Sequence, residues 1–167
     1  MSRKVATLGL LLAAAVILGY VEAVLPLPIP IPGIKLGLAN CAVLFVLYRY
    51  GFKEALLVTL LRTAVIALLF TSLPMLLYSA CGALGSILLM ALLKKRKAFS
   101  IYGLSMAGAA FHNTIQIAIA LLVLFSGGTY RTILCVYLPA LLLAAIPTGL
   151  FNAFLAERLT KLVPENT

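Results

Sequence analysis

Three polar side chains lie close together in an otherwise apolar stretch of the chain: His112, Asn113 and Gln116. His112 and Gln116 are four residues apart, and Asn113 and Gln116 three apart, so a helix would carry all three on one face. Imidazole and carboxamide groups can bind a small molecule, or they can clasp neighbouring helices together, and the sequence leaves both alternatives open. A single histidine without cysteine or carboxylate neighbours does not make a metal site.

Arg62, Lys35 and Asn40 are further candidates for ligand binding. Arg62 lies in the middle of an apolar run, where an arginine costs roughly 2.5–3.5 kcal/mol on insertion scales and needs a partner. That partner is either Glu22 or an anionic ligand. Lys35 and Asn40 follow a proline-rich segment, 26–33, and we expect them to face the same cavity. Cationic groups suit an anionic or phosphorylated ligand, whereas an apolar pocket suits an aromatic or isoprenoid body.

Acidic residues are too few for one large class of enzyme. The chain has four glutamates and no aspartate. Magnesium-dependent phosphoryl or prenyl transfer needs clustered carboxylates to hold the metal. We therefore expect a protein that is not an enzyme, with no catalytic residue, no metal and no cofactor. The sequence also contains no Walker motif, so any ATP hydrolysis would come from partner subunits.

The elements that must position these residues are long apolar helices. Hydrophobic residues make up 64% of the 167 residues and charged residues 10%. The apolar runs are continuous rather than alternating, which excludes barrel strands, and most are near the roughly 20 residues that cross a bilayer. We predict an all-α polytopic membrane protein, a single domain over 1–167, with a charged loop at 94–97. Its six transmembrane helices are expected at 5–25, 35–50, 53–70, 74–93, 99–125 and 131–162.

Basic residues predict the orientation. With the N-terminus inside, ten basic residues fall on the inner side and two, Lys35 and Arg131, on the outer side. Both termini are then cytoplasmic, and a bacterial cell membrane is the expected location. Membrane orientation explains the net charge of +9, so we expect no nucleic acid partner. A secretory signal peptide is the alternative for the first run, but that run is long for one.

Small residues in the first run form a second pattern. Gly9 and Ala13 are four apart, as are Ala15 and Gly19. Such spacing lets helices approach closely, either within the fold or against another membrane protein. The spacing does not decide between these two roles; a docking role would require that Gly9, Ala13 and Gly19 lie on an exposed face.

Two motifs resemble a known family. Residues 32–40, Pro-Gly-Ile-Lys-Leu-Gly-Leu-Ala-Asn, together with His112-Asn113-x-x-Gln116, resemble the Gx transporter family, also labelled heptaprenyl diphosphate synthase component I. The first helix, the proline loop and the segment 35–40 also resemble the substrate-binding S components of energy-coupling factor (ECF) vitamin transporters. The resemblance implies an S-component-like bundle, an outer ligand pocket, and coupling through small residues to a transmembrane subunit bound to ATPases.

Two functions therefore compete. The first is a substrate-binding subunit of an ECF-type transporter for a small, anionic or isoprenoid- or vitamin-like ligand. The second is a non-catalytic membrane accessory subunit of a heptaprenyl diphosphate synthase or a quinone-related pathway. A standalone channel is disfavoured, because no helix carries a long polar stripe. The sequence does not identify the ligand.

Overall fold

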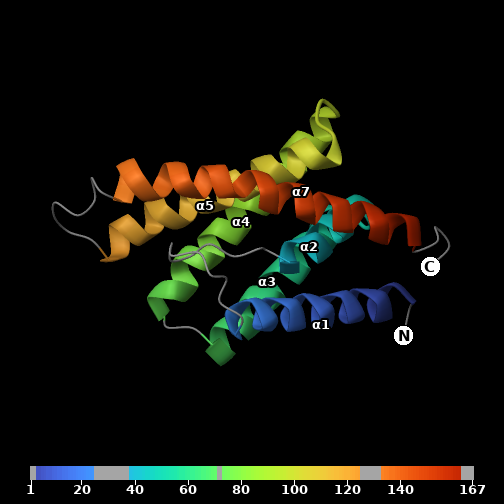
Figure 1. Ribbon diagram of the computed structural model, residues 1–167. Coiled ribbons are helices and arrows are strands. Elements are labelled where there is room, and N and C mark those ends of the chain that lie inside the picture. The colour runs from blue at the N-terminus through green and yellow to red at the C-terminus, as the bar shows by residue number, and fades with distance from the viewer. Residues whose placement is uncertain (1–2, 25–37, 71–72, 125–132, 163–167) are drawn as a thin grey trace.

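The part of the chain that the structure describes is helical apart from short turns. The computed structural model describes residues 3–24, 38–70, 73–124 and 133–162 (Figure 1). Across these ranges it contains six α-helices and one short π-helix, with no strand, which confirms the all-α prediction. The helices are α1 (Arg3–Val24), α2 (Leu38–Arg49), α3 (Phe52–Phe70), α4 (Leu73–Arg96), α5 (Ile101–Leu124), η1 (Ile133–Tyr137) and α7 (Leu138–Leu162).

Local sequence explains where several helices begin and end. Gly51 separates α2 from α3 with a φ of 104°, a left-handed conformation that glycine adopts without strain. Its amide donates to the Val46 carbonyl, 3.1 Å away, and its own carbonyl accepts from the Ala55 amide. Ser100 precedes α5, and its hydroxyl accepts a 3.2 Å hydrogen bond from the Gly103 amide, as an N-cap side chain does.

The prediction of a charged loop at 94–97 is wrong for three of the four residues, because α4 continues through Arg96. Lysine and arginine are good helix formers and are favoured in a last turn. Lys94 turns inward: its ammonium donates to the carbonyls of Leu47, 2.6 Å away, and Tyr48, 3.2 Å away. These carbonyls belong to the last turn of α2, so Lys94 satisfies acceptors that the helix leaves unpaired.

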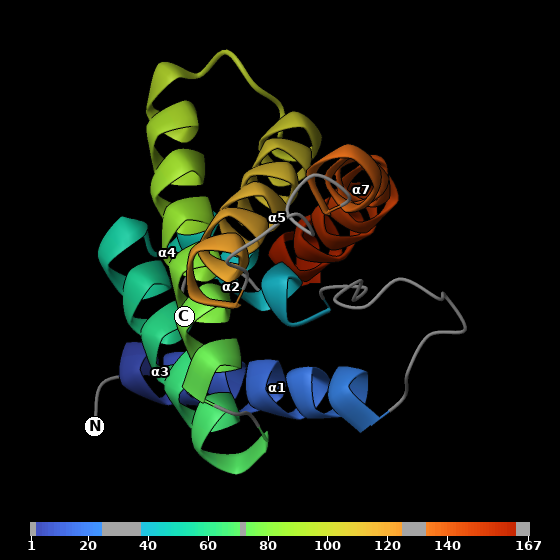
Figure 2. The ribbon, with the colours of Figure 1, turned by 90° about the vertical axis from the view of Figure 1, so that its left-hand side faces the viewer.

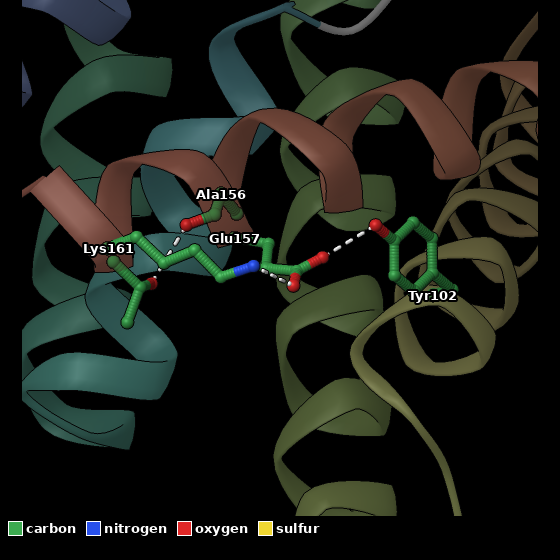
Figure 3. Close-up of polar contacts among 5 residues, drawn as sticks. Tyr102, Ala156, Glu157 and Lys161 are labelled. Carbon is green, nitrogen blue, oxygen red and sulfur yellow. Dashed lines mark hydrogen bonds and ion pairs between the residues drawn. The ribbon is translucent and has the colours of Figure 1, made fainter.

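Six helix termini lie together at one end of the bundle and contact one another. This basic end consists of the first turns of α1, α3 and α5 and the last turns of α2, α4 and α7. Lys4 of α1 forms a 2.5 Å ion pair with Glu54 of α3. Glu157 of α7 accepts a 2.6 Å hydrogen bond from the Tyr102 hydroxyl of α5 and pairs with Lys161 at 2.8 Å (Figure 3).

Positive charge is concentrated at the basic end, where the first residues of α1 and the last residues of α7 also lie (Figure 1). Among the described lysine and arginine side chains, Arg62 alone lies elsewhere, in the middle of α3. The predicted Lys35 and Arg131 on the opposite side fall outside the described residues. Two segments, Lys4–Val21 and Cys135–Leu162, are long and apolar enough to cross a membrane. Six spans with both termini cytoplasmic stay a prediction.

The hydrophobic core lies toward the basic end and is built around α2. Residues 41–47 of α2 are all buried, as expected for a helix that is apolar on every side. This helix packs against α1, α3 and α7 and lies near the middle of the bundle (Figure 2). Ile87 of α4, Leu104 of α5 and Ala153 of α7 complete the core with no exposed surface.

Candidate functional site

His112 lies half-buried on α5, where α5 packs against α4. A β-carbon added to Gly82 of α4 would lie 3.2 Å from the His112 ring carbon Cε1 and 3.0 Å from its carbonyl oxygen. The absence of a side chain at Gly82 therefore lets the imidazole rest against the backbone of α4. Sequence reasoning had no signal for this partner, because it depends on the register of two helices.

Asn113 faces a different neighbour. Its side-chain amide donates a 2.9 Å hydrogen bond to the carbonyl oxygen of Leu141, which is buried in α7. This contact supports the polar-clasp alternative for Asn113. Gln116 is half-buried one turn further along α5. The structure thus places His112 beside α4 and Asn113 against α7.

Replacing Asn113 with leucine is expected to destabilise the bundle by about 1 kcal/mol, because polar contacts between membrane helices average roughly that size or less. The Leu141 carbonyl also accepts within its own helix, which keeps the loss small. Thermal unfolding in detergent would measure the effect. A variant that unfolds like the native protein but no longer binds ligand would instead support direct ligand contact.

Arg62 and Asn40 occupy different environments. Arg62 is 8% exposed on the inner face of α3, beside the buried Thr59. Asn40 is half-buried in the first turn of α2. The Glu22 side chain, the whole of Lys35 and the proline-rich segment 26–33 lie outside what the structure describes. The two alternatives for Arg62, pairing with Glu22 or with a ligand, therefore both stay open, and so do the roles predicted for Lys35 and Asn40.

A groove of about 590 Å³ lies between α3 and α4. The residues that line it are apolar or small: Thr59, Leu60, Thr63, Ala64, Ala67, Leu68, Leu76, Ala80 and Leu84. Its volume falls within the roughly 300–1,000 Å³ range of ligand sites. The six predicted ligand-binding residues are not among those that line it. Thr59, Thr63 and Ala67 repeat every four residues along one face of α3, a spacing that is compatible with a groove but does not predict one without the facing helix.

Toward the basic end, the groove borders the hydrophobic core. Val58 of α3, next to Thr59, and Ile87 of α4, three residues beyond Leu84, are both buried in that core. The hydroxyl of Thr59 donates to the Ala55 carbonyl at 2.7 Å, so its hydrogen is already engaged. Because no charged residue lines the groove, its chemistry suits the apolar body of a ligand and not acid–base or metal chemistry.

The described part of the chain contains no candidate metal site. No group of three or more histidine, cysteine, aspartate or glutamate side chains comes together there. The three cysteines form no disulfide: Cys41 is buried, Cys81 half-buried and Cys135 exposed.

The predicted docking face on α1 is only partly exposed. Ala13 is exposed, and a β-carbon added to Gly9 would meet nothing within 4 Å. The expected exposure of Gly19 is wrong: a β-carbon there would lie 2.5 Å from the Cδ1 atom of Ile66 in α3. Gly19 therefore serves packing within the bundle, since only a residue without a side chain lets Ile66 approach. A docking role for Gly9 and Ala13 stays a prediction.

Comparison with known proteins gives a family match. No curated protein and no solved structure matches the chain. The sequence model described as heptaprenyl diphosphate synthase component I matches residues 11–159. This match runs from α1 to the last turns of α7 and takes in both the groove and the polar residues of α5. The chain therefore belongs to the heptaprenyl diphosphate synthase component I family.

Proposed function

We propose that the protein is a non-catalytic, membrane-embedded binding subunit whose ligand places an apolar body in the α3–α4 groove. The groove carries this proposal, because it is large enough for a small molecule and its lining offers mainly hydrophobic contact. An isoprenoid chain or an aromatic vitamin-like ring system fits that chemistry. The protein would cross the membrane six times, with the basic end and both termini in the cytoplasm.

The proposed position of the groove across the membrane favours a role in transport over a role as an accessory subunit of a synthase. In the proposed orientation the basic end is cytoplasmic, so the groove lies in the outer half of the membrane. A ligand would reach it from the outer side or laterally from lipid, as a substrate-binding subunit of an ECF-type transporter requires. A coupling subunit and ATPases would drive release toward the inside.

The second candidate is an accessory membrane subunit of a heptaprenyl diphosphate synthase. The family description and the apolar groove favour it. In that role the groove would hold part of an isoprenoid chain, and the basic end would contact a soluble catalyst. The synthase would have to supply the carboxylates for magnesium diphosphate, since this chain has four acidic residues in all.

Purification of the full chain from its native membrane separates these candidates. Crosslinking before solubilisation, followed by mass spectrometry, would identify the partners. ATPases with a coupling subunit support the transporter, whereas a soluble prenyl synthase supports the accessory role. Native mass spectrometry of the same sample would identify a retained ligand, and a strongly hydrophilic ligand would contradict the proposed use of the groove.

Replacing Ala13 with leucine tests the docking surface on α1. Ala13 is exposed, so a larger side chain there would hold a partner helix away without disturbing the bundle. Association with a coupling subunit should fall by about tenfold or more, while ligand affinity stays near the native value. Ala118→Leu, at an exposed position on α5, is the matched control. Equal effects of the two substitutions would contradict the proposal that α1 is the docking helix.

A further inference from the structure

The outward face of α4 combines exposed leucines with exposed basic residues. Leu88 is 50% exposed and Leu92 is 60% exposed, and Lys95 and Arg96 follow three and four residues after Leu92. At helical spacing these four side chains form one stripe along α4. Figure 2 shows the last turns of α4 at the periphery of the bundle, away from α1 and α7.

The structure shows that the basic residues 94–97 lie in two different environments, which the sequence does not distinguish. Lys94 is committed to the last turn of α2, and its ammonium also lies 4.9 Å from the centre of the Tyr48 ring. Lys95, Arg96 and Lys97 are exposed. The anchored Lys94 fixes the end of α4, so the exposed cations are held at a defined position above the leucines.

We propose that this stripe, Leu88, Leu92, Lys95 and Arg96, binds an anionic phospholipid of the inner leaflet. An acyl chain would run along the two leucines, and the phosphate would lie between the basic side chains, which can each donate hydrogen bonds to it. Phe99, 47% exposed in the following turn, adds an aromatic group beside the head group. The inference uses the proposed membrane location but is independent of what occupies the groove.

Continuity between the leucines and the cations favours a lipid over a soluble acidic protein. Leu92 lies one turn and Leu88 two turns before the basic residues, at a depth that is inside the bilayer in the proposed orientation. A soluble partner would reach the cations but not the leucines. A phospholipid matches both, because it carries an anionic head and an apolar chain in the same order along the membrane normal.

Native mass spectrometry of the full chain in detergent tests the site. The probes are phosphatidylglycerol and phosphatidylcholine with identical acyl chains. We expect tighter binding of phosphatidylglycerol to the native protein. K95Q/R96Q should weaken that binding about 25-fold, since each basic residue near an anionic head group contributes a factor of about five. Phosphatidylcholine binding should change less than threefold.

The control removes the same charge elsewhere on the basic end. K53Q/R158Q replaces two exposed basic residues outside the stripe and should leave phosphatidylglycerol binding near the native level. Thermal unfolding without added lipid should be the same for both variants. Equal loss in the two variants, equal affinity of the two lipids, or displacement of phosphatidylglycerol by inorganic phosphate alone would each overturn the proposal.

Discussion

Replacing Gly149 with alanine is expected to destabilise the protein by about 3 kcal/mol, at the upper end of the usual cost of overpacking. A β-carbon on Gly149 of α7 would lie 2.6 Å from the α-carbon and 2.8 Å from the amide nitrogen of Met106 in α5. These are backbone atoms, which cannot rotate away as a side chain would. The two helices must separate, and the hydrogen bond between Asn113 and Leu141 would weaken with them.

Gly9→Ala is the matched control for this substitution. Both glycines lie inside helices, so alanine brings the same gain in helix propensity, about 0.5–1 kcal/mol, at each position. At Gly9 the new methyl group meets nothing within 4 Å, so that variant should be as stable as the native protein or slightly more so. Thermal unfolding in detergent, followed by helical circular dichroism, would compare them. Similar unfolding temperatures for the two variants would contradict the close packing of α5 and α7.

Most helices could be predicted because the sequence consists mainly of long hydrophobic runs separated by helix-breaking residues. The predicted span 53–70 agrees with α3 (Phe52–Phe70) to one residue, since Gly51 ends the preceding helix in a left-handed conformation that glycine adopts without strain. The error at α4 has a different origin. A run of four charged residues suggests an exposed loop, but lysine and arginine also favour a helix C-terminus.

The candidate site was harder to predict, because it depends on which helix faces each residue. Spacing placed His112, Asn113 and Gln116 on α5 correctly, but it could not reveal that Asn113 reaches the Leu141 carbonyl of α7. The groove was missed for the same reason. Small and apolar residues in α3 are common in any membrane helix, and they become a groove only where α4 presents Ala80 and Leu84 opposite them.

Filling the groove is expected to reduce binding of an apolar ligand by roughly 100-fold. Ala67 lines the groove from α3 and Ala80 lines it from α4. A phenylalanine at position 67 would occupy space that the ligand needs, and losing contacts worth about 3 kcal/mol corresponds to that factor. The probe is radiolabelled geranylgeraniol, whose isoprenoid chain matches the proposed ligand class, with binding measured in detergent.

Two further variants make the result decisive. Ala80→Leu reduces the groove from the opposite helix, so a loss of binding in both variants would reflect the shared space and not damage to α3. Ala118→Phe adds the same volume at an exposed position of α5 and should bind geranylgeraniol as the native protein does. His112→Ala is the contrasting substitution, because His112 rests against Gly82 and is not among the groove residues. If His112→Ala abolishes binding while Ala67→Phe and Ala80→Leu retain it, the ligand occupies the polar region of α5. The groove would then be a lipid-filled gap between α3 and α4.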